Sequence, residues 1–155
     1  MDMNEPRLPI VAKICKVLND AGVRYAIGGS TLLFIKGISF SFNDLDLMVL
    51  VEDAEKAREV LKTIGEYHPS DKKSSSKTFD EFTVDGLDVD VISGFILESY
   101  GKQYDCSFKN ENTEVFDLLG TPVVLDSLQA WYDIYLYLGR VQRARYIKDY
   151  LLYHK

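Results

Sequence analysis

Two acidic pairs in this sequence have the spacing that places side chains together on a β-strand. Asp44 and Asp46 alternate with leucines, and Asp88 and Asp90 alternate with aliphatic residues in a second, similar stretch. Residues i and i+2 of a strand point to the same side, so each pair would place two carboxylates on one face. Two such strands side by side would gather carboxylates whose mutual repulsion calls for cations among them. That is the electrostatics of a two-metal phosphoryl-transfer site.

The first pair, Asp44 and Asp46, has a simpler interpretation, in which both side chains are solvated on an exposed sheet face. Its surroundings argue against that interpretation. Residues 47–50 are Leu, Met, Val and Leu, which predicts a central, buried strand. Aspartate is depleted in strands, and a buried carboxylate without a partner is costly. A bound cation is the economical explanation.

The second pair does not contribute equally. Asp90 lies between Val89 and Val91, within the apolar part of its stretch. Asp88 lies closer to the Asp85-Gly86 dipeptide, where an exposed position at the start of a strand would explain it. We expect Asp90 to be the third metal ligand and keep Asp88 as the alternative.

A glycine pair, Gly28 and Gly29, precedes Ser30 between a predicted strand and a predicted helix. Glycines allow a tight turn and a close approach of backbone to a ligand, and the amides at a helix start favour phosphate. Ser30 has the residue type of an N-cap. The pair could also serve only to make the turn. The lysine and further glycines of a P-loop or a dinucleotide fingerprint are absent.

Composition sets the class of protein. The chain has 155 residues, of which 46% are hydrophobic, and this suits a single domain with one core. A net charge of -6 argues against a dedicated nucleic-acid-binding protein, although a nucleotide could bind through magnesium. Cys15 and Cys106 form neither a disulfide framework nor a zinc motif, and Cys15 is expected in a helix core. There is no apolar run of membrane-spanning length and no signal-peptide pattern, so we expect a cytoplasmic protein.

The elements that must position these residues alternate between helical and strand patterns. Gly22 ends the first helix, Asp85-Gly86 predicts a tight hairpin, and Asp126 or Ser127 caps the fourth helix. Helices are expected at residues 10–21, from 31, at 54–64, 128–138 and 141–153, and strands at 23–27, 44–51, 78–84, 87–93, 115–118 and 122–125. Residues 68–77 and 98–112 are expected to be polar loops.

This pattern predicts an α/β (α+β) fold, with a mixed β-sheet flanked by helices and a C-terminal helical extension. We find no internal repeat and no linker of domain size. The whole chain, 1–155, is therefore expected to be one domain. Residues 1–97 would form its catalytic core, and residues 98–155 its final strand and C-terminal helices.

The three motifs together resemble the nucleotidyltransferase superfamily that includes DNA polymerase beta. The resemblance lies in residues 25–32, 43–47 and 86–92, in the family's order, and it spans the first two-thirds of the chain. Small members include antibiotic-modifying and toxin–antitoxin nucleotidyltransferases. Two features depart from the family. Residues 34–43 are a longer connection than the smallest members have, and the arginine that many carry before the first aspartate is missing.

The resemblance implies the nucleotidyltransferase fold and a role for each motif residue. Asp44 and Asp46 would hold Mg²⁺ on the triphosphate of an NTP, and the turn at Gly28, Gly29 and Ser30 would bind phosphate oxygens. Asp90 would bind a second metal ion or act as the base for an acceptor hydroxyl. The product would be a nucleotidylated acceptor plus pyrophosphate.

The C-terminal third allows two interpretations at each point. The aromatic residues from 131 to 137 suit a helix core better than a base-stacking platform. Arg140, Arg143, Arg145 and Lys148 could form a solvated helix face, or one or two of them could reach the triphosphate. Because a closing helix of small family members carries a basic residue near the nucleotide, Arg140 and Lys148 are the candidates.

Three functions follow from the resemblance. The favoured one is NMP transfer to a hydroxyl of a small molecule such as an antibiotic. The alternatives are a toxin–antitoxin enzyme that modifies a protein or tRNA, and a catalytically silent nucleotide-binding module. Retention of all three acids favours activity, and the acidic charge argues against tRNA. The chain has little room for a separate acceptor-binding domain, and a homodimer would be one way to complete the acceptor site.

Overall fold

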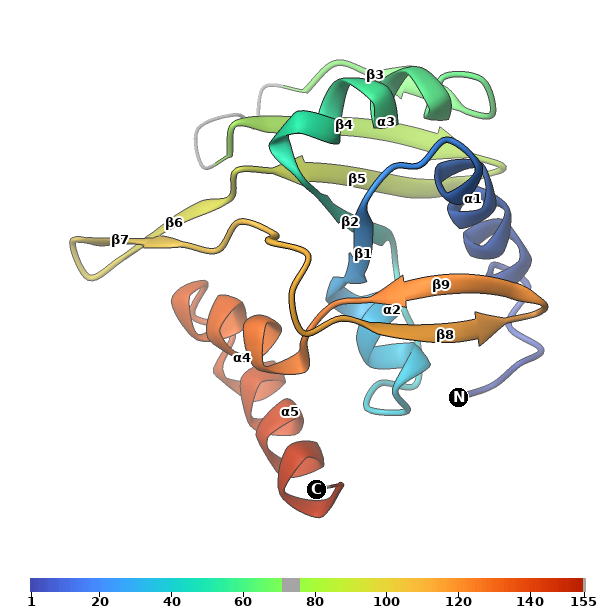
Figure 1. Cartoon of the computed structure of the whole chain (residues 1–155). Coiled ribbons are helices and arrows are strands. Elements are labelled where there is room, and N and C mark those ends of the chain that lie inside the picture. The colour runs from blue at the N-terminus through green and yellow to red at the C-terminus, as the bar shows by residue number, and fades with distance from the viewer. Residues whose placement is uncertain (71–75, 155) are drawn as a thin grey trace.

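A seven-stranded sheet organises the protein in the computed structural model, which describes residues 1–70 and 76–154 (Figure 1). The helices are α1 (Leu8–Asp20), α2 (Gly29–Ile35), α3 (Ala54–Leu61), α4 (Leu128–Tyr137) and α5 (Val141–Tyr153), with a 3-10 turn η1 (Val51–Asp53). The strands are β1 (Tyr25–Gly28), β2 (Leu45–Val49), β3 (Glu66–His68), β4 (Thr78–Val84), β5 (Leu87–Ser93), β6 (Ile96–Ser99), β7 (Lys102–Asp105), β8 (Glu114–Leu118) and β9 (Thr121–Leu125).

The sheet is mixed, as the sequence predicts. Its order is β3-β4-β5-β2-β1-β9-β8, in which β2 and β5 are parallel, β1 and β9 are parallel, and the other neighbours are antiparallel. β9 comes from the last third of the chain, and it lies beside β1 from the first thirty residues. The strand pair β1 and β9 therefore lies on one side of β2, and the second motif strand, β5, lies on its other side.

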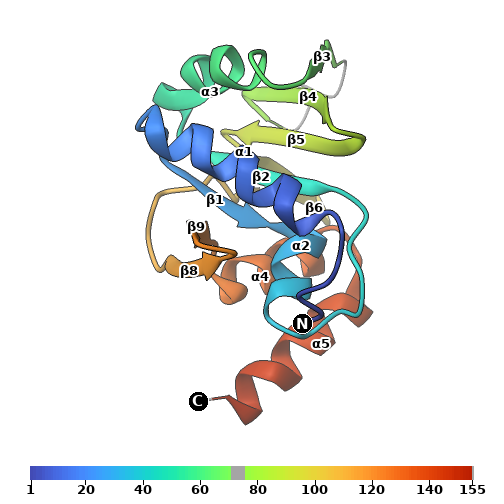
Figure 2. The ribbon, with the colours of Figure 1, turned by 90° about the vertical axis from the view of Figure 1, so that its right-hand side faces the viewer.

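The two faces of the sheet differ. Asp80 of β4 pairs with Arg58 of α3, with 3.1 Å between carboxylate and guanidinium, and its register partner on β5 is Val91. Val91 in turn lies beside Leu47 of β2, so Asp80, Val91 and Leu47 face the helices. α1 and α3 pack together and cover this face (Figure 2). Because side chains alternate along a strand, the aspartates of β2 and β5 point to the opposite face.

Several local predictions are confirmed. The hairpin between β4 and β5 turns at Asp85 and Gly86, which both have positive φ, 51° and 86°, as a tight hairpin turn requires. The hydroxyl of Ser127 accepts a hydrogen bond from the amide of Ala130 at 3.2 Å and caps α4. Cys15 is fully buried in α1.

The polar passages contain structure that the sequence pattern did not predict. β6 and β7 form a separate two-stranded ribbon within residues 96–105, and β3 adds an edge strand at residues 66–68. The exposed ribbon alternates polar and apolar residues only weakly, and three-residue β3 is too short for a pattern. Of the predicted loop at residues 68–77, residues 71–75 lie outside the described part of the chain.

The two C-terminal helices form the predicted helical extension. α4 buries Trp131, Ile134 and Tyr135, whereas α5 buries only Ala144 and Ile147. Accordingly, α5 projects away from the sheet (Figure 1). The predicted core role of the aromatic helix is confirmed for Trp131, which is 4% exposed. None of the described helices has the length and apolar character needed to span a membrane.

An ion pair ties the start of β1 to the turn after β2. The backbone amide and the guanidinium of Arg24 both donate to Asp53, at 3.0 and 2.8 Å, and these bonds hold the pKa of Asp53 below its usual value. The ionised Asp53 therefore makes its full contribution to the free energy of unfolding above its unfolded-state pKa of about 4. This contribution is lost as pH falls through the lower folded-state pKa. Asp53→Asn should lower the free energy of unfolding at pH 7, and the deficit should shrink as pH falls below the unfolded-state pKa and the folded protein takes up a proton at Asp53.

Urea denaturation across this pH range measures the effect, with Glu52→Gln, a change at the exposed neighbouring acid, as the control. A deficit for Asp53→Asn that stays constant down to the lowest pH would show that the bonded carboxylate is not its source.

Candidate active site

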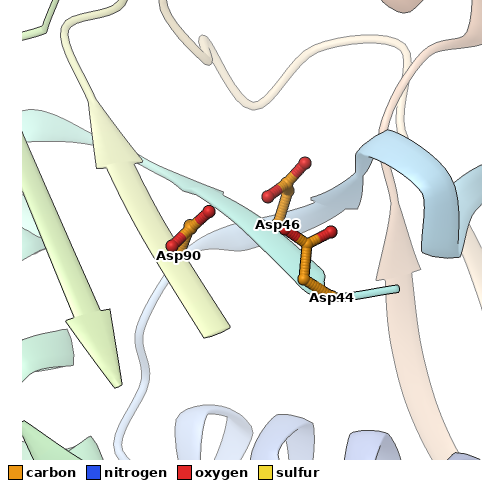
Figure 3. A group of neighbouring side chains, drawn as sticks. All are labelled: Asp44, Asp46 and Asp90. Atoms are coloured by element: carbon orange, nitrogen blue, oxygen red, sulfur yellow. The ribbon is translucent and has the colours of Figure 1, made fainter. Parts of the chain in front are cut away.

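Three carboxylates meet on the open face of the sheet. Asp44 directly precedes β2, Asp46 lies within β2, and Asp90 lies beside Asp46 on β5. One oxygen of each carboxylate lies within 4.8 Å of an oxygen of the other two, and the three side chains converge in Figure 3. Asp88 is outside this group: it is exposed and accepts a hydrogen bond from Thr83 at 3.4 Å.

The glycine turn and the acidic strand form one structural unit. Gly28, the last residue of β1, lies opposite Asp46 in the antiparallel β1–β2 ladder. The hydroxyl of Thr31 donates to the backbone carbonyl of Asp44 at 2.7 Å, and the amide of Asn43 donates to the hydroxyl of Ser30 at 3.4 Å. The turn therefore fixes the backbone on which the first two carboxylates stand.

Both glycines are required by close contacts. Gly29 has φ +60°, and a Cβ there would lie 2.1 Å from a carboxylate oxygen of Asp46. A Cβ on Gly28 would lie 2.2 Å from the indole of Trp131. The role of N-cap expected for Ser30 is wrong, because the left-handed Gly29 starts α2 earlier and Gly28 is the N-cap, without a side-chain cap. Ser30 lies in the first turn of α2.

Arginines from the helical extension approach this group. The charge of Arg140, which precedes α5, acts on Asp46 and favours its ionised form. Arg143 lies 5.6 Å from the ring centroid of Tyr135, and it lines a pocket of about 370 Å³ together with Ser30 and Asn43. Arg143 belongs to the basic group that the sequence indicates, but the narrower prediction names Arg140 and Lys148. The i, i+3 spacing of Arg143 from Arg140 could have indicated that these two lie on one side of the helix.

Lys148, the other basic candidate, has a different environment. It lines a separate pocket with Tyr132, Leu151 and Leu152. That position does not support a contact with a phosphate held at Ser30, and the assignment of Lys148 to the nucleotide stays a prediction.

Burial and repulsion act most strongly on Asp46. Desolvation is the largest cause, the charges of Asp44 and Asp90 add to it, and together they raise the pKa of Asp46 to about 8. The positive charge of Arg140 opposes the shift without cancelling it. Burial and the neighbouring charges therefore favour the protonated form of Asp46 in the metal-free protein, and Asp46 shares a hydrogen bond with Asp90.

The fold of the chain has counterparts among solved structures. A candidate nucleotidyltransferase from Thermotoga maritima matches with a TM-score of 0.73 at 22% identity, over 97% of this chain and 96% of that one. ANT(2'')-Ia, solved with adenylyl-2''-tobramycin, matches with a TM-score of 0.67 at 12% identity, over 94% and 90% of the two chains. The chain has the nucleotidyltransferase fold.

A third structure with the nucleotidyltransferase fold broadens this likeness. The lincosamide antibiotic adenylyltransferase LnuA, bound to lincomycin, matches with a TM-score of 0.60 at 11% identity, over 94% of this chain and 96% of that one. No protein-family model and no curated protein sequence matches the chain. The structural comparison therefore identifies the fold where the sequence comparisons do not. It is the fold that the three sequence motifs predict.

The carboxylate group of this nucleotidyltransferase fold suits a divalent cation. Carboxylate oxygens are the ligands that Mg²⁺ prefers, and the three acids come close enough to share one or two ions. The raised pKa of Asp46 shows that the group is costly to ionise without a counter-charge. Asp44, Asp46 and Asp90 therefore fit the role of metal ligands.

The raised pKa predicts a stability change for the metal-free protein. Between pH 4 and pH 8, about the unfolded- and folded-state pKa values of Asp46, the folded protein binds more protons than the unfolded chain, so stability falls as pH rises. Asp46→Asn removes this cost, and we expect its melting temperature in EDTA to exceed that of wild type at pH 8 to 9. The difference should shrink toward pH 4.

Calorimetry in EDTA and in Mg²⁺ measures this prediction, and added Mg²⁺ should stabilise wild type more than the variant. An Asp46→Asn protein that melts below wild type at pH 9 in EDTA would contradict the proposed repulsion.

The contact between Gly29 and Asp46 predicts a loss of metal binding. In Gly29→Ala, the new methyl group must displace the Asp46 carboxylate, so Mg²⁺ affinity should fall at least about tenfold. Gly120→Ala is the matched control, because Gly120 also has positive φ, +88°, but an added Cβ there meets nothing within 4 Å. The control should lose about 1 kcal/mol of stability from backbone strain alone. Equal Mg²⁺ affinities by titration calorimetry would contradict this account of Gly29.

Proposed function

We propose that the protein is a metal-dependent nucleotidyltransferase that transfers an NMP from an NTP to a hydroxyl of a small-molecule acceptor and releases pyrophosphate. The observation that carries this proposal is the meeting of three carboxylates within 4.8 Å beside the glycine turn of a nucleotidyltransferase fold. A structural role would not require three acids to share one site at such electrostatic cost.

Each part of the site has a distinct task in this proposal. Asp44 and Asp46 hold Mg²⁺ on the triphosphate, and the metal, when bound, neutralises phosphate charge. The backbone at Gly28 and Gly29 allows the phosphates to approach closely, and Ser30 donates to a phosphate oxygen. Many family members carry an arginine before the first aspartate, and this chain does not. Here Arg140, together with Arg143 in the pocket beside Ser30, supplies the positive charge instead.

The reaction is an in-line displacement at the α-phosphorus. The acceptor oxygen forms a bond to this phosphorus as the bond to the bridging oxygen of pyrophosphate breaks. In this proposal Asp90, which lies on the neighbouring strand, takes the proton of the acceptor hydroxyl or contributes a metal ligand. The leaving pyrophosphate keeps the electron pair of the broken bond.

A small-molecule acceptor is favoured over a macromolecule. The structural counterparts include proteins solved with adenylyl-2''-tobramycin and with lincomycin, and this chain covers nearly their whole length. The net charge of -6 disfavours tRNA. A protein-modifying toxin and a silent nucleotide-binding module are the alternatives that the experiment below separates. An NTP substrate suits a cytoplasmic location, and a homodimer would be one way to enlarge the acceptor site.

The decisive experiment supplies Mg²⁺ and each of the four NTPs, labelled at the α-phosphate, with tobramycin, lincomycin and a wider panel of hydroxylated small molecules. We expect pyrophosphate release and label transfer by wild type, and a loss of at least about a thousandfold in Asp44→Asn and Asp90→Asn. Asp88→Asn, on the same strand face as Asp90 but outside the carboxylate group, is the matched control and should stay active.

The alternatives give different results in the same experiment. Label on protein or tRNA from a cell extract, with none on small molecules, would favour the toxin type. Binding of Mg-NTP without transfer to any acceptor would favour the silent module. Equal activity of wild type and Asp44→Asn would overturn the assignment of the metal site.

A further inference from the structure

A further pocket, of about 340 Å³, lies between β7 with its following loop and α4. Its lining comes from residues 104–112 and 126–137, and it includes none of the three clustered aspartates, the glycine turn or the arginines near them. Its volume is within the range of pockets that hold small organic molecules. None of its lining residues has a role in the proposed nucleotide transfer.

One wall of this pocket is aromatic. Tyr104 of β7 and Tyr137 of α4 stack with ring centroids 4.0 Å apart and planes 13° apart. The pair joins the ribbon to the helix and presents ring surface to the pocket beside Ile134 and Phe108. An apolar or aromatic body of a ligand would find its contacts here, and aromatic rings also attract organic cations.

Most of the charged groups in the remaining lining are acidic. Four carboxylates face one ammonium group, Lys109, and this group lies 3.8 Å from one of them, Asp105. The carboxylates are Asp105, Glu111, Asp126 and Asp133. The negative charge also acts on the Cys106 thiol: burial raises its pKa to about 11, and Asp105 and Asp133 contribute. Cys106 therefore stays a neutral thiol, and the pocket favours a cation.

The carboxylates of this pocket are spread around it rather than gathered at one point. In the described part of the chain, Asp44, Asp46 and Asp90 are the group of three whose ligand atoms come together, and the acids of the pocket beside β7 and α4 form no such group. Carboxylates spread around a cavity suit a larger cation whose positive charge is carried on an organic body.

The most buried of these four carboxylates, Asp126, is held in place by hydrogen bonds. Asp126 is buried and accepts hydrogen bonds from the indole of Trp131 at 3.0 Å and from the amide of Ser127 at 2.8 Å. These bonds fix the carboxylate at the base of α4 and leave lone pairs for a further donor. Trp131 also contacts Gly28 of the glycine turn, so one side chain, Trp131, connects Asp126 of the pocket with the candidate active site.

We propose that this pocket binds a small organic molecule that carries a protonated amine, with the amine at the carboxylates and its body against the tyrosine pair. The proposal goes beyond nucleotide transfer and does not depend on it. In such a ligand the ammonium group matches the acidic side chains, the organic body matches the aromatic wall, and the whole molecule fits the volume of the pocket.

A matched pair of probes tests the proposal on the full-length, ¹⁵N-labelled protein. Benzylammonium and neutral benzyl alcohol have the same ring and nearly the same size, so they differ mainly in charge. In NMR titrations at constant ionic strength, benzylammonium should shift amides within residues 104–112 and 126–137 with saturation. Benzyl alcohol should bind at least about tenfold more weakly.

Two variants separate pocket binding from general attraction to an acidic protein. Asp133→Asn should weaken benzylammonium binding about fivefold or more, whereas Asp149→Asn, a change at an exposed acid of α5 outside the pocket, should not. Glu111→Gln, in the loop on the opposite wall, replaces Asp133→Asn if that variant does not fold. Equal affinity for the two probes, shifts confined to other residues, or equal losses in Asp133→Asn and Asp149→Asn would each overturn the proposal.

Discussion

Repulsion among Asp44, Asp46 and Asp90 is the constraint on which the rest of this structure depends. Like charges a few ångströms apart on a partly buried surface are tolerated only if the surrounding fold is rigid enough to hold them. The rigidity comes from the centre of the sheet, where β2 is paired on both sides, and from α1 and α3 on the other face. The mutually repelling carboxylates thus lie on a strand whose backbone is hydrogen-bonded to neighbours on both sides.

The sequence predicts the centre of the molecule better than its borders. The alternation of aspartates with aliphatic residues is a direct consequence of a buried strand with one polar face, so β2, β5 and their carboxylates could be found from spacing alone. The Asp85-Gly86 turn and the Ser127 cap were equally predictable, because each is a local interaction of a few residues. What is local in space and in sequence was accessible to prediction.

The missed features depend on contacts between distant parts of the chain. The sequence predicts that Gly28 and Gly29 form a turn, with or without a phosphate beside it, but the contacts that exclude a side chain there come from Asp46 and Trp131. Arg143 acquires its importance only because α5 returns beside α2 and Tyr135. The β6–β7 ribbon and the pocket beneath it arise from pairing of exposed residues with no strong periodicity. No single stretch of sequence contains this information.

The contact of Trp131 with Gly28 has a consequence for how the protein is made. During synthesis the N-terminal two-thirds of the chain leaves the ribosome with every carboxylate of the site but without β9 beside β1 and without the indole against the turn. Long-range pairings of this kind form slowly, because a large loop must close first. The nascent chain therefore carries an unfinished site until β9 and α4 emerge, because these elements supply the strand beside β1 and the indole against the turn.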